Sequence, residues 1–206
     1  MPGSGRRKPL KQQRAIETRN AIILGAAAVF SRVPYAEARL KDLASESGIS
    51  EGALYFHFAS KRDIAFEVVA VQQERMHGAL TEVLSRGGNA LDKMLSAYAA
   101  LADLVASDVV VQGGIYLQNQ PGTELADATN EPYLEWVRLA RILVLEGVED
   151  GSVRPDVDAD GAAEFLNALF IGAQVLSNHA DSWASMPVRM RSFEPLVRIA
   201  LAPASS

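Results

Sequence analysis

The chain has 206 residues, of which 49% are hydrophobic, a formal charge of −5 and no cysteine. This length predicts one or two domains with a sizeable core, and the missing cysteines exclude disulfides, thiolate catalysis and cysteine-based metal sites. The three histidines, His57, His77 and His179, stand far apart, so we expect neither a metal site nor a cofactor. There is no run of 18 apolar residues and no secretory signal core, which predicts a cytoplasmic protein without a membrane partner.

Charge is distributed unevenly along the chain. Residues 1–62 carry eleven Lys or Arg and five Asp or Glu, a net charge of +6, whereas the remainder carries nine basic and twenty acidic residues, a net charge of −11. Contact with phosphates supplies most of the sequence-independent affinity of proteins for DNA. A basic first third therefore predicts a DNA-binding head on a body that does not bind DNA. Chance clustering around a basic tail is the simpler alternative.

Residues 1–10 are rich in proline, glycine and basic residues, which predicts a flexible basic tail. From about residue 11 to 31, apolar residues follow a helical period behind a polar first face that includes Arg14. We expect the basic start of this helix to lie along a phosphate strand. The link that follows ends at Arg39, where a capping residue for the next helix is expected. Arginine can contact phosphate, but it cannot accept hydrogen bonds from helix amides.

Residues 40–58 have the pattern of a helix-turn-helix. Leu40 and Leu43 recur at helical spacing. Gly48 stands where a left-handed residue would end that helix, and Ser50 can cap a second short helix. In such a motif the second helix enters the DNA major groove with its first residues nearest the base edges.

We expect the first residues of this second helix to lie nearest the bases and the longer side chains after them to reach bases or phosphates. Basic residues before and after the motif add phosphate contacts. The predicted DNA-binding residues are Arg14, Arg39, Lys41, Ser50, Glu51, Gly52, Ala53, Tyr55, His57 and Lys61. Leu54, Phe56 and Phe58 are expected to fill the core of this domain, which spans residues 11–59.

Ser60 followed by Asp63 predicts the capped start of a long helix that runs to about residue 85 and links the head to the body. No segment of any length has the alternating pattern of a strand. The chain is therefore predicted to be all-α with about nine or ten helices, residues 60–206 forming a helical body. Its further helices are expected at about residues 90–106, 108–119, 130–150, 159–179 and 187–201.

The run from Gly48 to Phe58, with Lys61-Arg62-Asp63-Ile64 after it, resembles the signature of TetR-family transcriptional regulators. Its Gly-Ala-Leu-Tyr-Phe-His-Phe is similar to the γ-butyrolactone autoregulator receptors of actinomycetes, and the resemblance extends over about 50 residues in register. One departure lies in the link before the motif. Such proteins usually have Gly before the aromatic residue and Thr or Ser just before the second helix, where Pro34, Ala38 and Arg39 stand here.

The resemblance implies a homodimeric repressor that binds a palindromic operator and leaves it when a small lipophilic, γ-butyrolactone-like signal binds in the body. The long fourth helix would transmit the signal to the heads; a passive strut is the alternative. Two heads are also needed because one helix reads only a few base pairs. By resemblance the interface is a four-helix bundle, and the predicted interface residues, some of which could instead belong to the core, are Phe165, Leu169, Gly172, Leu176, Phe193, Leu196 and Val197.

Polar and aromatic side chains on otherwise apolar helices of the body fit a pocket for a lipophilic ligand, and equally a core with polar residues at its rim. The segment Pro132-Tyr133-Leu134-Glu135-Trp136 resembles the part of the butyrolactone receptors that places a tryptophan on the ligand. The predicted ligand-binding residues are Trp136, Tyr98, Gln112, Tyr116, Tyr133 and Gln174.

Other readings stay open from the sequence. A pseudo-receptor would keep the fold and respond to an antibiotic or a furan-type signal. A ligand-independent DNA-binding protein would have no sizeable cavity in its body. The sequence has no glycine-rich phosphate loop, nucleophile elbow or metal-ligand spacing, so we expect that the protein is not an enzyme.

Overall fold

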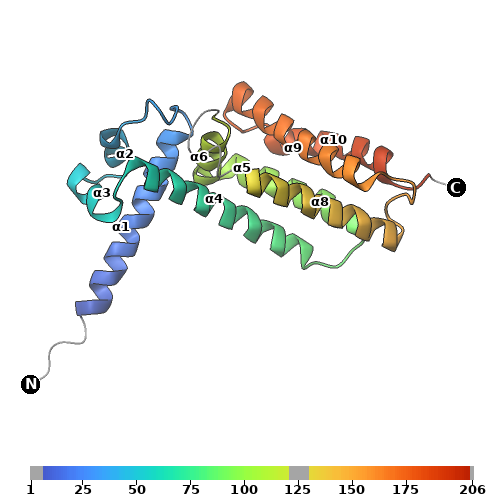
Figure 1. Ribbon diagram of the computed structural model, residues 1–206, viewed down its shortest axis with the longest axis horizontal. Coiled ribbons are helices and arrows are strands. Elements are labelled where there is room, and N and C mark those ends of the chain that lie inside the picture. Colours follow the sequence, from blue (N-terminus) through green and yellow to red (C-terminus); the bar gives the residue numbers. More distant parts are fainter. Residues whose placement is uncertain (1–6, 121–129, 205–206) are drawn as a thin grey trace, which may run out of the picture. The chain divides into compact units, whose positions relative to one another are not determined.

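The computed structural model describes the backbone of residues 7–120 and 130–204, and the side chains of residues 12–120 and 134–204. Within these residues the chain forms nine helices and no strand, which confirms the predicted all-α fold (Figure 1). Most of the predicted flexible tail lies outside the described residues, and the first helix begins at Arg7 rather than near residue 11.

The remaining helices agree closely with the predicted segments. The described helices are α1 Arg7–Phe30, α2 Leu40–Glu46, α3 Glu51–His57, α4 Lys61–Leu84, α5 Ala90–Ser107, α6 Val109–Gln118, α8 Asn130–Asp150, α9 Ala159–Asp181 and α10 Met186–Leu201. None of them alone is long and apolar enough to cross a membrane; the bent pair α5 and α6 reaches that length and composition only when taken together.

The chain divides into two compact units, and α4 and the α5–α6 region contribute to both. Unit 1 comprises residues 1–73 and 109–125, and unit 2 comprises residues 74–108 and 126–206. The sequence placed the domain boundary near residue 60. Unit 1 is larger than that prediction because it also contains α6 and the first half of α4.

The core of unit 1 is built from five helices that each contribute a fully buried side chain. Phe30 of α1, Leu43 of α2, Leu54 of α3, Ile64 of α4 and Leu117 of α6 all have 0% exposure and belong to one apolar cluster. Burying a side chain of this size contributes about 1.5–3 kcal/mol relative to leaving it in water. This shared core holds the two short helices of the helix-turn-helix in place.

α6 approaches α1 and α4 closely because two consecutive glycines face them. A Cβ at Gly113 would lie 2.6 Å from the carbonyl oxygen of Ala27, and a Cβ at Gly114 would lie 2.5 Å from Cβ of Gln72. Real Cβ atoms do not come so near other heavy atoms, so a larger residue would push α6 away. The glycine pair therefore explains how α6 joins unit 1.

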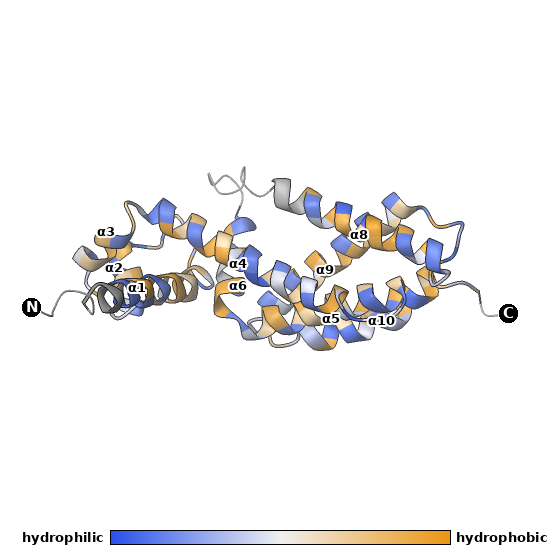
Figure 2. Cartoon of the chain, turned by 90° about the horizontal axis from the view of Figure 1, so that it is seen from below, coloured by the Kyte–Doolittle hydropathy of each residue, from blue (hydrophilic) through white to orange (hydrophobic). Residues whose placement is uncertain are grey.

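Unit 2 is a bundle of α5, α8, α9 and α10 with the end of α4 (Figure 1). Orange hydrophobic and blue hydrophilic residues alternate along these helices, as expected for helices that bury one face (Figure 2). α5 lies between two buried clusters: Met94 packs with Leu166 and Val197, whereas Ala97 packs with Leu80.

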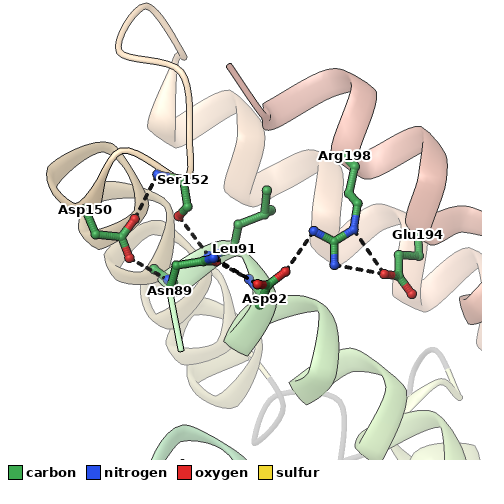
Figure 3. A network of polar contacts seen from close by, with 8 residues as sticks. Asn89, Leu91, Asp92, Asp150, Ser152, Glu194 and Arg198 are labelled. Carbon is green, nitrogen blue, oxygen red and sulfur yellow. Dashed lines mark hydrogen bonds and ion pairs between the residues drawn. The ribbon is translucent and has the colours of Figure 1, made fainter. Parts of the chain in front are cut away.

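Polar side chains fix the first turn of α5 (Figure 3). Three successive N–H groups donate to side chains: Ala90 to Asp150 Oδ2 at 2.6 Å, Leu91 to Ser152 Oγ at 3.2 Å, and Asp92 to Asn89 Oδ1 at 2.8 Å. These N–H groups have no partner within the helix, so the side chains satisfy them. Arg198 of α10 binds Asp92 at 2.8 Å and Glu194 at 3.0 Å. The network thus ties α5 to α10 and to the turn after α8.

Candidate DNA interface and ligand site

The turn between α2 and α3 has the geometry that the sequence predicts. Gly48 has a φ of +69°, in the left-handed region that favours glycine. The N–H of Ile49 donates to the carbonyl oxygen of Ala44 at 3.0 Å and closes the end of α2. Ser50 Oγ accepts a hydrogen bond from the N–H of Ala53 at 3.2 Å, which confirms the predicted cap of α3.

The start of α2 has no such cap. Arg39 occupies the N-cap position with extended backbone, and its side chain makes no hydrogen bond to the helix. The side chains of Arg39 and of Lys41 two residues later are exposed. The missing cap is therefore confirmed, and two cations stand in its place at the surface of unit 1.

One face of α3 is exposed and the opposite face is buried. Glu51, Gly52, Tyr55 and Phe56 are exposed, with Tyr55 at 54% and Phe56 at 83%, whereas Leu54 has 0% exposure. The prediction that Phe56 fills the core is wrong. Phe56 follows Leu54 by two residues, which is about 200° around a helix, so the two side chains point in opposite directions.

The other residues predicted to contact DNA differ in exposure. Arg14 and Ser50 are exposed, whereas Ala53, His57 and Lys61 are half-buried. The ring of His57 stands edge-on to the ring of Phe56, with 5.3 Å between their centroids. The structure thus gathers most of the predicted residues on or beside α2 and α3, and their contact with DNA stays a prediction.

Lys61 is engaged within unit 1. Its Nζ donates to the carbonyl oxygens of Tyr35 at 2.6 Å and Ala38 at 2.9 Å, and it stands 4.4 Å from the centroid of the Tyr35 ring. Burial lowers the pKa of the Lys61 ammonium from its ordinary value. These contacts have no local signal in the sequence, because Lys61 meets residues more than twenty positions earlier in the chain.

The residues predicted to bind a ligand are divided between the two units. Trp136 and Tyr98 both lie in unit 2, but Trp136 packs in the cluster with Leu80, whereas Tyr98 packs in the cluster with Leu166. The buried Gln174 also lies in unit 2. Gln112 and Tyr116 are on α6 in unit 1, and the side chain of Tyr133 lies outside the described residues. The structure therefore divides the predicted set between the two units, and the ligand-binding role of these residues stays a prediction.

The ring of Trp136 stacks on the ring of His77. Their centroids are 5.2 Å apart and the planes differ by 28°. Both side chains are half-buried. Because His77 belongs to α4 and Trp136 to α8, the stack is a direct contact between these two helices within unit 2.

Tyr98 lines a small hollow between α5, α9 and α10, with Leu95, Leu166, Leu169, Met190 and Phe193 among its other walls. The space in it is about 20 Å³, which is room for about one water molecule and not for a lipophilic signal. Burial raises the pKa of the Tyr98 hydroxyl above its ordinary value. The Tyr98 ring also packs against Phe170, with 5.5 Å between centroids.

The last two helices carry an exposed apolar face. Its residues on α9 and α10 are Phe165, Ile171, Val175, Leu176, Val188, Leu196 and Ile199. Three of the predicted interface residues, Phe165, Leu176 and Leu196, belong to it, and Gly172 is half-buried beside it. Val197 does not belong to the surface, because it is 3% exposed and packs in the core of unit 2.

Comparison with known proteins gives two family matches. Residues 22–68 match the model of "Bacterial regulatory proteins, tetR family", and residues 88–203 match a "Tetracyclin repressor-like, C-terminal domain". The A-factor receptor protein of Streptomyces griseus is 31% identical over 173 residues, which cover 84% of this chain. The matched stretch spans 59% of the length of that receptor.

Solved structures give the same result. A γ-butyrolactone receptor described as an ArpA-like protein is 26% identical with a TM-score of 0.79, covering 93% of this chain and 91% of that one. The TetR family protein CprB from Streptomyces coelicolor, in complex with its biological operator sequence, is 25% identical with a TM-score of 0.78 and the same coverage. The helix-turn-helix and the helical bundle are thus found together in these proteins.

Proposed function

Because the chain belongs to the TetR family of bacterial regulatory proteins, we propose that it is a homodimeric repressor that releases its operator when a small lipophilic ligand binds in unit 2. It is a DNA-binding transcriptional regulator and not an enzyme, as the sequence predicted. The observation that carries the proposal is the exposed face of α3. This helix is the second helix of a helix-turn-helix, it is capped by Ser50 and follows a turn at Gly48, and it lies in the basic part of the chain.

The exposed apolar face supports the proposed dimer. Leu176, Leu196 and Ile199 are 54%, 60% and 79% exposed in the single chain. Contiguous apolar surface of this kind marks protein interfaces. Pairing of two chains through α9 and α10 would bury it and would supply the two heads that a palindromic operator requires, with half-sites one helical turn apart.

The stack of Trp136 on His77 supports the proposed coupling. A ligand that packs on Trp136 competes with the His77 ring for the same face of the indole or changes the distance between α8 and α4. α4 continues from His77 to Lys61 in unit 1 without a break. A displacement of His77 therefore moves the other end of the same helix, α4, which begins beside the helix-turn-helix. The coupling free energy expected for such an effect is about 1–3 kcal/mol.

Similarity to the A-factor receptor and to the γ-butyrolactone receptor supports a γ-butyrolactone-like signal. The hollow beside Tyr98 is too small for such a molecule, so the proposed ligand site is the one at Trp136. A pseudo-receptor for an antibiotic or furan-type signal and a ligand-independent DNA-binding protein are the alternatives. The first would respond to a different compound, and the second to none.

A gel-shift series on the DNA upstream of the protein's own gene tests the proposal, with and without candidate lactones. Tyr55→Ala should lower operator affinity about tenfold or more and leave the dimer intact, with Tyr55→Phe as the matched control. Trp136→Ala should bind the operator like the wild type but fail to release it with lactone. Unchanged affinity in Tyr55→Ala would contradict the proposed reading face. A normal lactone response in Trp136→Ala would remove Trp136 from the ligand site.

A further inference from the structure

Phe56 is the most exposed large hydrophobic side chain among the described residues, at 83%. It is on α3, next to Tyr55, and its ring meets the edge of the His57 ring. A fully exposed phenylalanine gives up the free energy that its burial would contribute, about 1.5–3 kcal/mol. Single exposed apolar residues are common, but this one lies on the face that the proposed function turns toward DNA.

The core of unit 1 does not need Phe56. Leu54 and Phe58, two residues to either side, are 0% and 6% exposed and fill the space beneath α3. The guanidinium of Arg19 covers the Phe58 ring at 5.0 Å and is itself held by Glu67 at 2.5 Å. The buried side of α3 is thus complete, and a change at Phe56 leaves it intact.

The surface around Phe56 is open on the side of the helix N-terminus. Gly52 lies one turn earlier on the same face, and a Cβ built there would meet only Ser50 Oγ, at 3.9 Å. Tyr55, beside Phe56, carries a hydroxyl that can bind a phosphate or a base edge. The backbone of α3 at Gly52, one turn before Phe56, is therefore open to the approach of another group.

The chemistry of the ring limits what it can recognise on DNA. A phenyl ring has no hydrogen-bond donor or acceptor, so it can neither bind phosphate nor read the polar base edges. The apolar group that the major groove presents is the 5-methyl group of thymine. The net charge of +6 over residues 1–62 brings a phosphate backbone to this surface in preference to an apolar protein partner.

We propose that Phe56 is a specificity-determining residue that reads thymine in each operator half-site through contact with the 5-methyl group. This inference rests on the proposed DNA-binding function and adds to it the base that one side chain selects. It assigns the exposed ring to base readout, whereas Arg39 and Lys41 act on phosphates irrespective of sequence.

The test uses deoxyuridine, which lacks the 5-methyl group but keeps all the hydrogen-bonding groups of thymine. An operator is first selected from random duplexes by the wild-type protein. Each thymine is then replaced in turn, symmetrically in both half-sites, and the dissociation constant is measured by fluorescence anisotropy for wild type, Phe56→Ala and Phe56→Leu. Ile142→Ala, on α8 and 50% exposed, is the control for loss of an exposed apolar side chain elsewhere.

At one thymine position, methyl removal should weaken binding by the wild type about fourfold for each methyl group contacted. In Phe56→Ala the same removal should have no effect, Phe56→Leu should keep part of it, and Ile142→Ala should behave like the wild type. The salt dependence of binding should be the same in Phe56→Ala and wild type, because no phosphate contact is lost.

The inference is overturned if methyl removal has equal effects in wild type and Phe56→Ala, or no effect in either. A loss of affinity in Phe56→Ala that is the same for every duplex would show a contact with the sugar or backbone instead. Circular dichroism checks that the variants fold. If the wild type selects no duplex at all, the proposed function itself fails, which is a different result from a wild type that binds without a methyl effect.

Discussion

The two short helices of unit 1 begin with opposite kinds of residue. Ser50 supplies α3 with a hydrogen bond to its amides, whereas Arg39 supplies α2 with none. A missing cap of this type costs about 1 kcal/mol. In exchange, Arg39 places a cation next to the exposed Lys41, where a phosphate can be bound. Stability of α2 and affinity for DNA therefore make opposite demands on this residue.

Arg39→Ser should separate these two demands. The serine should raise the free energy of unfolding by about 0.5–1 kcal/mol in urea titrations, because it can cap α2. It should also weaken binding equally for all duplexes and lower the slope of log affinity against log salt by about one. Ser50→Ala is the matched control and should lower stability by about 1 kcal/mol. A less stable Arg39→Ser variant would show that another group already satisfies the α2 amides.

The carboxylate of Asp150 makes the stability of unit 2 depend on pH. The Ser152 side chain, and then the N–H groups of Ala90 and Ser152, donate to this carboxylate and hold its pKa below the ordinary value of 3.8. A lowered pKa in the folded state means stability that is present above the ordinary value. This stability is lost as the pH falls through 3.8 toward the lower pKa of the folded protein.

Asp150→Asn should therefore lower the thermal midpoint at pH 7, and the difference from wild type should shrink as the pH is reduced toward 3. Thermal unfolding followed by circular dichroism at a series of pH values measures this. Glu149→Gln removes a neighbouring exposed acid and is the control for a change of charge alone. A difference that stays constant over this range would mean that the hydrogen bonds of Asp150 do not depend on its charge.

Helix ends were predictable from the sequence because capping is local. Ser50 binds an amide three residues ahead, and Ser60 Oγ likewise accepts from the N–H of Asp63 at 3.1 Å, so both signals lie within one turn. The outward direction of Phe56 was also accessible, from its offset of two residues from Leu54. Hydrophobic character alone does not place a side chain in the core, because helical geometry decides which way it points.

The place of α6 could not be predicted, because its contacts join distant parts of the chain. Gly113 meets Ala27 of α1, and Gly114 meets Gln72 of α4, and neither partner is marked by the local pattern around α6. The same holds for the proposed ligand site at Trp136, whose contact with His77 joins residues far apart in sequence. Periodicity identifies which helix faces are buried, but not which helices they bury against.

Gly114→Ala should destabilise unit 1 by about 1–3 kcal/mol, because the new Cβ overlaps the side chain of Gln72. Gly78→Ala on α4 is the control, since a Cβ there meets nothing within 4 Å and alanine favours a helix. Urea unfolding measures both. Equal stability of Gly114→Ala and wild type would mean that α6 can move away from α4 without loss of packing.

The exposed apolar face of α9 and α10 bears on how two chains associate. A single chain leaves Leu176 and Leu196 more than half exposed, while the net charge of residues 63–206 is −11. Such a charge keeps chains apart unless the contact surface is itself free of charge. The side chains that form the apolar face carry no charge, which favours pairing through this face over general association.

Leu176→Glu should convert the dimer into monomers and lower operator affinity at least 100-fold, because a buried carboxylate without a partner is costly and a single head reads only half of the operator. Size-exclusion chromatography with light scattering measures the mass. Ile142→Glu on α8 is the matched control, because Ile142 is also about half exposed but lies outside the apolar face. A Leu176→Glu variant that still runs as a dimer would place the interface elsewhere.

The contacts of Lys61 bear on how the reading helices can move. One ammonium group at the first residue of α4 binds two carbonyl oxygens of the link before α2 and lies over the Tyr35 ring. Arg19 adds a second tie, from α1 to Glu67 of α4. With these connections and the shared apolar core, we expect a tilt of the start of α4 to move α1, α2 and α3 together with it. Effector control would then act through the orientation of an intact reading surface, with no local unfolding of the surface itself.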